Sequence, residues 1–142
     1  MANINIADKY TITDKKTELF SDFGVDMQLH PGKKDLVRNV NENAIKRSIV
    51  NLLLTSYHER FYQPYLGANL QQLLFEPVSD DVLGQIKHQI LNCIAKFEPR
   101  AKVLDLQLTV SQDEHTIYST LVFATMNTTT PTTLSFILNR VR

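Results

Sequence analysis

Apolar side chains in the middle of the chain recur every three or four positions, which places them on one face of a helix. The clearest pattern begins after Ser79, a residue type that caps helix N-termini, and stops at Pro99. A second helix is predicted in residues 39–57, with Asn41 as its N-cap and an apolar arc wide enough to be buried on two sides. A short leucine-rich helix is predicted between the two, over residues 70–76.

From Arg100 onward the apolar period becomes two, which is the spacing of β-strands. A β-branched and aromatic segment over residues 116–126 is predicted to be a central strand, and the last strand is predicted over residues 134–141. Turn residues at 111–115 and 127–133 separate the strands. In the first strand, we expect one face to carry Leu104, Leu106, Leu108 and Val110.

Helices followed by a run of strands are typical of the α+β class. We therefore predict a single domain over residues 1–142, in which two main helices and a short helix pack on a C-terminal antiparallel three-stranded β-meander. Residues 1–35 are expected to form an extended N-terminal arm with one or two short strands. Residues 36–99 are expected to form the helical part, and residues 100–142 the meander.

The chain has 142 residues, a formal net charge of zero and 43% hydrophobic residues, as expected of a globular domain. Zero net charge argues against a protein that binds nucleic acid by charge alone. The single cysteine, Cys93, cannot form an internal disulfide, and no apolar run approaches the roughly 20 residues that span a bilayer. Because the start of the chain also lacks a signal-peptide pattern, we expect a protein that is made and used in the cytoplasm, or assembled there, with no membrane or nucleic-acid partner.

Residue types with metal-binding or nucleophilic chemistry are present but do not form a recognised motif. The four histidines are scattered and there is no HExxH pattern, so no metal site is predicted. Cys93 falls near the apolar side of its predicted helix and is expected to be a small core residue. Because the chain has neither a nucleophile elbow nor a glycine-rich phosphate loop, no cofactor is expected.

Glu59 and Glu98 are the best candidates for a pair of catalytic carboxylates. Both lie beside aromatic or apolar residues, which can raise a carboxylate pKa, and a glycoside hydrolase needs such a pair across its cleft. Both also stand near an arginine, Arg60 or Arg100, which would keep them ionised, and the chain has no tryptophan for sugar stacking. A lysozyme-like peptidoglycan hydrolase that uses Glu59 and Glu98 is therefore kept as the alternative hypothesis, and no catalytic residue is assigned.

The predicted junction of helix and strand contains two opposite charges around a proline. Pro99 moves Glu98 out of helical geometry, and a carboxylate at the negative end of a helix dipole is mildly unfavourable. Glu98 is therefore expected either to pair with a basic residue of this chain, such as Arg60, or to meet a partner.

Aromatic residues crowd the loop after the first predicted helix. They either cover the edge of the core or form a recognition surface, because aromatic residues and arginine are enriched where protein partners dock. The four residues are Tyr57, Phe61, Tyr62 and Tyr65.

Three stretches of the chain resemble the wedge-protein family of contractile phage tail baseplates, the sheath-initiator type. They are "NENAIKRSIVNLLLT", "ERFYQPYLGANLQQLLFEP" and "FEPRAKV", they occur in the family's order, and the match covers roughly residues 36–110. Related proteins occur in the baseplates of type VI secretion systems. Many members of this family carry glycine where this chain has His58, so a less tight turn is expected there.

The resemblance implies a non-enzymatic structural protein of the virion, located in the inner tail baseplate and tied to the first ring of the sheath. The implied partners are other wedge proteins, tail sheath subunits and inner baseplate proteins near the tail tube. The Glu-Pro-Arg loop is implied to hold the helical bundle of neighbouring wedge proteins, and the meander to accept strands from sheath arms at an edge. Partner-binding residues are then expected to be Glu98, Pro99, Arg100, Glu59, Arg60, Phe61, Tyr62, Pro64, Leu134, Phe136 and Leu138.

A third hypothesis is a small cytoplasmic regulator that uses the same fold to bind one protein partner. Tail genes on both sides of its gene would favour the structural virion protein instead.

Overall fold

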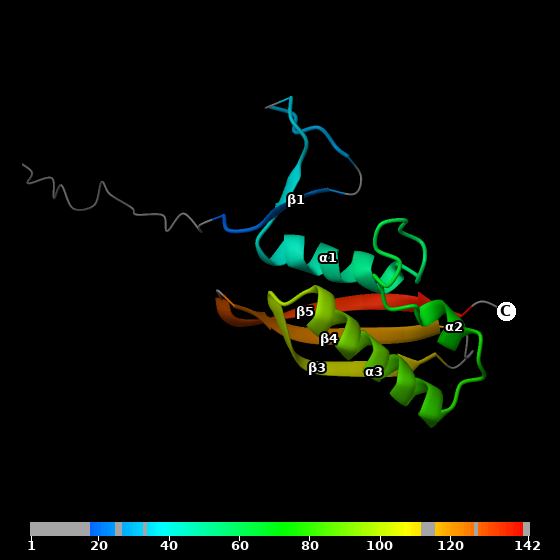
Figure 1. Ribbon diagram of the computed structural model, residues 1–142. Coiled ribbons are helices and arrows are strands. Elements are labelled where there is room, and N and C mark those ends of the chain that lie inside the picture. The colour runs from blue at the N-terminus through cyan, green and yellow to red at the C-terminus, as the bar shows by residue number, and fades with distance from the viewer. Residues whose placement is uncertain (1–17, 25–26, 33, 112–115, 127, 141–142) are drawn as a thin grey trace, which may run out of the picture.

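A three-stranded antiparallel sheet with helices on one side forms the body of the protein, and a small hairpin stands beside the first helix (Figure 1). Part of the predicted arm, over residues 1–17, lies outside the described residues, as does the turn at 112–115. The computed structural model describes residues 18–24, 27–32, 34–111, 116–126 and 128–140.

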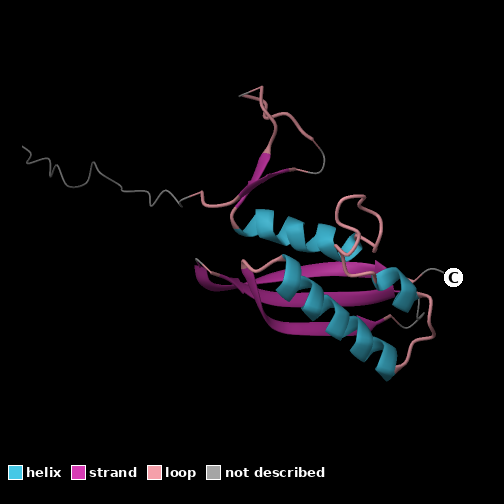
Figure 2. Ribbon diagram, viewed as in Figure 1, coloured by secondary structure: helices cyan, strands magenta, loops and turns pink. Residues whose placement is uncertain are grey.

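The elements run in the order of hairpin, helices and sheet (Figure 2). The hairpin pairs β1 with β2, and the sheet has the order β3-β4-β5 with antiparallel neighbours. This arrangement confirms the predicted α+β class. The bounds are β1 (Ser21–Phe23), β2 (Arg38–Val40), α1 (Glu42–Leu54), α2 (Leu70–Leu74), α3 (Asp80–Phe97), β3 (Ala101–Val110), β4 (Thr116–Thr125) and β5 (Thr128–Asn139).

The predicted limits of α3 are confirmed. The Ser79 side chain accepts a hydrogen bond from the backbone N–H of Val82 at 3.3 Å, which satisfies one of the free donors of the first turn. The helix ends before Glu98, whose φ of −128° is extended, because the following Pro99 disfavours helical geometry in the residue before it.

Asn41 does not cap α1 in the predicted way. Its side chain makes no cap hydrogen bond to the helix; its Oδ1 instead accepts a hydrogen bond from the backbone N–H of Leu19 at 2.9 Å. The Asn41 backbone N–H also donates to the carbonyl of Phe20 at 2.7 Å. The residue therefore fastens the start of the hairpin to the start of α1.

A β-bulge in β3 changes which side chains face the helices. Val103 pairs with Phe123 and Asp105 pairs with Val122, so Leu104 is the extra residue. The prediction that Leu104 shares a face with Leu106 is therefore wrong, because the bulge reverses the alternation between them. Leu106 is buried, whereas Leu104 is 54% exposed.

Strand β5 begins earlier than predicted. Residues 128–133 were expected to form a turn because of their proline and polar composition, but they belong to the strand. Threonine is β-branched and favours strands, and Pro131 is tolerated because β5 lies at an edge of the sheet.

The side chains that alternate along β5 pack against the core. Leu138 is buried, and Leu134 and Phe136 are half-buried against the core. Leu138 is therefore not available to a partner, whereas the partner contacts expected for Leu134 and Phe136 stay a prediction.

The core lies between the helices and the sheet. Each fully buried side chain of this size contributes about 1.5–3 kcal/mol. Cys93 belongs to this core, as predicted, and burial raises the pKa of its thiol to about 11. The side chains with 0% exposure include Ile45, Ile49, Ile86, Ile90, Ile94, Leu121 and Phe123.

Candidate functional site

The Glu98 side chain turns into the protein at the point where α3 ends and β3 begins. It is only 2% exposed. Arg100 donates to it twice, from Nε to Oε1 at 2.5 Å and from Nη2 to Oε2 at 2.7 Å. The Ser48 hydroxyl, which comes from α1, donates to Oε2 at 2.5 Å. Glu98 therefore joins α1 to the junction of helix and strand through charge-assisted hydrogen bonds.

Two opposing effects act on the charge of Glu98. Burial by itself raises the pKa of the carboxyl, because it removes water from the charged form. The hydrogen bonds from Arg100 and Ser48 and the positive charge of Arg100 outweigh burial, so the pKa of Glu98 lies below its ordinary value of 4.5. In the same pair, the hydrogen bond to Glu98 raises the pKa of Arg100. Both groups are therefore ionised at neutral pH.

Arg100 connects the junction to two other parts of the protein. Its guanidinium carbon lies 5.1 Å from the centroid of the Phe20 ring, which is a cation–π contact with the segment before β1. Its carbonyl accepts a hydrogen bond from the backbone N–H of Met126, beside the end of β4, at 3.3 Å. The side chain is still 39% exposed. Arg100 is therefore fixed in position while part of its charge faces solvent.

These contacts correct two expectations about Glu98. Its ionic partner is Arg100, not Arg60, which is exposed in the loop after α1. The carboxylate also does not reach a surface where a partner could touch it, so within the triplet Pro99 is exposed and Arg100 is partly exposed. Sequence reasoning missed Ser48 because it lies 50 positions away from Glu98, and no local pattern marks it.

The aromatic residues of the loop after α1 point into solvent. Phe61 is 98% exposed, Tyr62 is 100% exposed and Tyr65 is 71% exposed. The interpretation that they cover the core edge is therefore wrong for these three residues, and the recognition surface is favoured. Tyr57, the fourth aromatic residue, is 37% exposed, and its hydroxyl accepts a hydrogen bond from Gln89 of α3 at 3.0 Å.

The loop has a defined shape despite its exposure. His58 has a φ of 66°, the left-handed conformation that glycine adopts easily, so the turn keeps a glycine-like shape at this position. Its backbone N–H donates to the carbonyl of Pro64 at 2.7 Å. Gly67 has a φ of 121°, and a Cβ there would lie 2.2 Å from the carbonyl oxygen of Thr55. These backbone contacts therefore fix the two ends of the loop, while the side chains of Phe61 and Tyr62 are exposed to solvent.

The two glutamates do not form the carboxylate pair of a hydrolase. Glu59 is exposed, and its Oε2 accepts a hydrogen bond from the backbone N–H of Ser56 at 2.9 Å. The lowered pKa of Glu98 is opposite to the raised pKa that a general acid needs.

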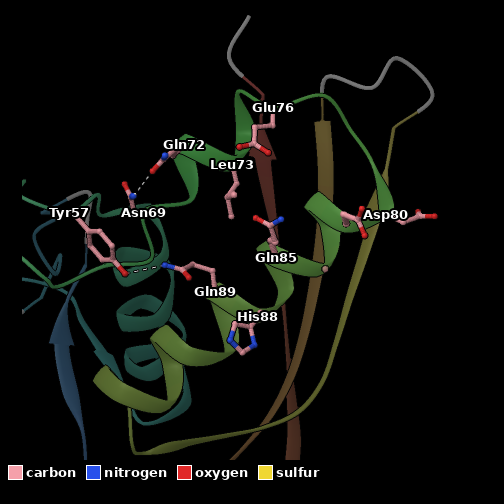
Figure 3. A pocket seen from close by; sticks show the side chains of 11 residues that line it. Tyr57, Asn69, Gln72, Leu73, Glu76, Asp80, Gln85, His88 and Gln89 are labelled. Atoms are coloured by element: carbon pink, nitrogen blue, oxygen red, sulfur yellow. Dashed lines mark hydrogen bonds between the residues drawn. The ribbon is translucent and has the colours of Figure 1, made fainter.

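An open hollow of about 850 Å³ lies between α2 and α3 (Figure 3). Its acidic side chains are Glu76, Asp80 and Asp81, and amide side chains make up much of the rest. Neither Glu59 nor Glu98 is among its lining residues. Across the described ranges, no three histidine, cysteine or carboxylate residues are grouped so that they could hold a metal ion. In the same ranges, no helix has the length and apolar character needed to cross a membrane.

Comparison with known proteins gives one family match and one curated relative. The family model "Baseplate wedge protein gp25" matches residues 39–131. Baseplate wedge protein gp25 of Enterobacteria phage T4 is 24% identical over 127 residues, which cover 89% of this chain and 86% of the T4 protein. The matched region contains both the aromatic loop and the Glu-Pro-Arg triplet.

Solved structures share the fold at low sequence identity. A Geobacter sulfurreducens protein, provisionally described as a tail lysozyme, has a TM-score of 0.64 and 21% identity, with 69% of this chain and 89% of that chain covered. A chain of the anti-feeding prophage baseplate has a TM-score of 0.60 and 16% identity, with 87% of each chain covered. A chain of the pyocin R2 baseplate after contraction has a TM-score of 0.52 and 16% identity, with 68% of this chain and 93% of that chain covered.

Proposed function

Since the chain belongs to the family of baseplate wedge protein gp25, we propose that it joins the wedge to the sheath and initiates sheath assembly in a contractile tail. It is a structural component of the tail baseplate, and its proposed partners are the helical bundle of neighbouring wedge proteins, the tail sheath and the inner baseplate proteins near the tube. Two surfaces carry the proposed contacts to the wedge bundle: the Glu-Pro-Arg triplet and the aromatic loop.

The single observation that carries the proposal is the fixed, partly exposed charge of Arg100. The pair with Glu98 uses Nε and Nη2, and within the described residues the guanidinium makes no further hydrogen bond. A side chain that is already held in one rotamer loses little conformational entropy when a partner binds it. The remaining donors of Arg100 can therefore bind a carboxylate, or the free carbonyls at the C-terminal end of a partner helix.

Pro99 also supports the proposal that the Arg100 surface contacts a partner. It is exposed beside Arg100, and its ring fixes the backbone between the two charged residues. In this arrangement Glu98 acts as a positioning residue and Arg100 as the contact residue.

The aromatic loop supplies a second proposed contact. Phe61 and Tyr62 are almost fully exposed, and Arg60, Glu59 and Pro64 lie around them. Aromatic anchors of this kind bury large areas with only two rotatable side-chain bonds, which suits the centre of an interface.

The best test of the Arg100 contact neutralises both members of the ion pair. A single Arg100→Glu variant would leave buried Glu98 without its partner, at a cost of about 3–5 kcal/mol, so it would confuse unfolding with lost contact. The double variant Glu98→Gln/Arg100→Gln removes both charges and keeps the side-chain sizes similar. We expect it to be folded by circular dichroism but absent from purified baseplates.

The matched control is Arg38→Gln, which removes an exposed arginine charge from the hairpin, where its side chain is 52% exposed. This variant should enter baseplates at the wild-type level. If the folded double variant also enters at that level, the contact role of Arg100 is wrong.

A further inference from the structure

The hollow between α2 and α3 takes no part in the contacts proposed for Arg100, Phe61 and Tyr62, because none of these three residues lines it. Its volume of about 850 Å³ lies within the roughly 300–1,000 Å³ that is usual for binding pockets. It is open to solvent and lined mainly by polar side chains (Figure 3). The hollow is therefore a separate surface, and its lining residues decide what it can hold.

A glycine in the wall of the hollow is not explained by the fold. Gly84 lies in the first half of α3, it is exposed, and a Cβ at this position would meet nothing within 4 Å. Glycine weakens a helix relative to alanine, and the backbone of α3 does not need its conformational freedom. Because the missing side chain leaves space in the hollow, we attribute this glycine to what enters the hollow.

Amide side chains supply hydrogen-bonding groups to the hollow. Gln85 and Gln89 point from α3 toward the space between the two helices (Figure 3). Gln89 donates to the hydroxyl of Tyr57 at 3.0 Å, whereas Gln85 has no hydrogen-bond partner in the part of the chain that the structure describes. A glutamine amide has two donor hydrogens and an acceptor oxygen. Gln85 can therefore bind the peptide groups of an incoming segment.

The charge of the hollow is negative. Glu76 follows α2, Asp80 and Asp81 begin α3, and none of the three forms an ion pair with another described residue. The positive end of the helix dipole offsets part of the charge of the two aspartates. Arg140 lies beside the hollow and donates to the Glu76 carbonyl at 3.0 Å, but no lysine or arginine lines it. An incoming cation is therefore favoured over an anion.

We propose that the hollow between α2 and α3 binds a segment of another baseplate protein, and that a lysine or arginine side chain of this segment enters beside Glu76 and Gln85. The backbone of the segment approaches α3 at Gly84, where any other residue would place a side chain. The inference goes beyond the proposed function by adding a contact surface. It takes from that function only that the chain works inside a baseplate.

Site-specific photocrosslinking in assembled particles tests the location of this contact. The photoreactive residue p-benzoylphenylalanine replaces His88, which lines the hollow and is exposed. The control probe replaces Lys87, which is also exposed but does not line the hollow. We expect position 88 to crosslink to a lysine- or arginine-containing peptide of another baseplate protein at least about tenfold more efficiently than position 87. Mass spectrometry identifies the peptide.

Two substitutions at Gln85 test the sign of the partner's charge in particles that carry the probe at position 88. Gln85 is exposed, and both lysine and glutamate favour helices, so Gln85→Lys and Gln85→Glu should fold alike. The lysine repels a basic segment and should lower the crosslink at least about tenfold, whereas the glutamate should keep or raise it. Equal crosslinking by the two variants would overturn the assignment of a basic partner.

Filling the hollow from Gly84 should separate stability from binding. Gly84→Gln replaces a helix-weakening residue with a helix-forming one, so Tm should be at or above the wild-type value. The crosslink from position 88 should nevertheless fall at least about tenfold, because the new side chain stands where the partner approaches. Ala95→Gln, at an exposed position of α3 that does not line this hollow, should leave the crosslink unchanged. Undiminished crosslinking in Gly84→Gln would overturn the proposed role of the glycine.

The possible results separate this inference from the proposed function. Equal crosslinking from positions 87 and 88 would overturn the inference and leave the baseplate function standing. Crosslinks from position 88 only to other copies of this chain, or within the chain itself, would do the same. If purified wild-type particles lack the chain altogether, the proposed function fails and the inference fails with it.

Discussion

At the scale of single residues, the charge of Glu98 is the feature with the clearest physical consequence. A carboxylate that is 2% exposed is stable as an ion only because Arg100 and Ser48 donate hydrogen bonds to it. Removing one member of such a buried group leaves the others without a partner. The same contacts that orient Arg100 therefore also stabilise the fold.

The Glu98→Gln variant should be less stable than the wild type at neutral pH by about 1.5–3 kcal/mol, the value of hydrogen bonds to a charged group. The pKa of Glu98 is lowered on folding, so its ionic contribution is present above the ordinary pKa of 4.5 and is lost as pH falls below that value through the folded pKa. The difference between the two proteins should therefore shrink in acid. Urea unfolding between pH 7 and pH 3 measures this, and a difference independent of pH would contradict it.

At the scale of elements, the shape of the aromatic loop depends on its base. Gly67 is in a conformation that side chains rarely adopt, and the Thr55 carbonyl lies where a Cβ would be. Gly84, in contrast, is an exposed position in α3, and a Cβ there would meet nothing within 4 Å. Gly67 is therefore required by the backbone of the loop, whereas α3 does not require glycine at position 84.

The same substitution should have opposite effects at these two glycines. Gly67→Ala should destabilise the protein by at least about 1–3 kcal/mol, because it forces the loop away from Thr55. Gly84→Ala should stabilise it by about 0.5–1 kcal/mol, because alanine restricts the unfolded chain and favours the helix. Thermal unfolding of both variants checks the signs. A rise in Tm for Gly67→Ala would show that the loop adapts.

The sheet shows why the apolar periodicity of a single strand is not enough to predict which way its side chains point. Periodicity in β3 is local, but the bulge at Leu104 depends on how Val103 and Asp105 pair with β4. A one-residue offset reverses every side chain beyond it. The early start of β5 is a similar case, because Pro131 is acceptable only in a strand that proves to lie at an edge.

At the scale of the whole molecule, surfaces far apart in the sequence are joined to one core. The aromatic loop follows α1, and the Arg100 surface follows α3. The helices and the sheet share buried apolar side chains, so these surfaces are held by one packed unit. A rigid body with several contact surfaces suits a protein that connects different parts of an assembly.

Replacing the exposed aromatic side chains of the loop should impair baseplate assembly without changing the stability of the folded protein. The double variant Phe61→Ser/Tyr62→Ser alters side chains that are 98% and 100% exposed, so unfolding free energy should stay within about 0.5 kcal/mol of the wild type. Incorporation into baseplates should fall sharply, because the proposed anchors are gone. Phe75→Ser, at a residue that is 59% exposed after α2, is the control and should assemble normally. Normal incorporation of the double variant would remove the loop from the proposed interface.

The sequence by itself determined the kinds of elements and their order. Helical and strand periods, the Ser79 cap and the Pro99 stop act over a few residues, so they could be predicted without the fold. The ordered motifs likewise pointed to the family, which the match over residues 39–131 confirms.

Only the tertiary structure decided what each functional side chain faces. The burial of Glu98 depends on Ser48, which lies 50 positions away, and the exposure of Leu104 depends on strand pairing across the sheet. Whether Phe61 covers the core or faces solvent depends on how the folded chain places the loop, and it is 98% exposed. These outcomes are set by long-range contacts, and a local pattern carries no information about which distant residues will meet.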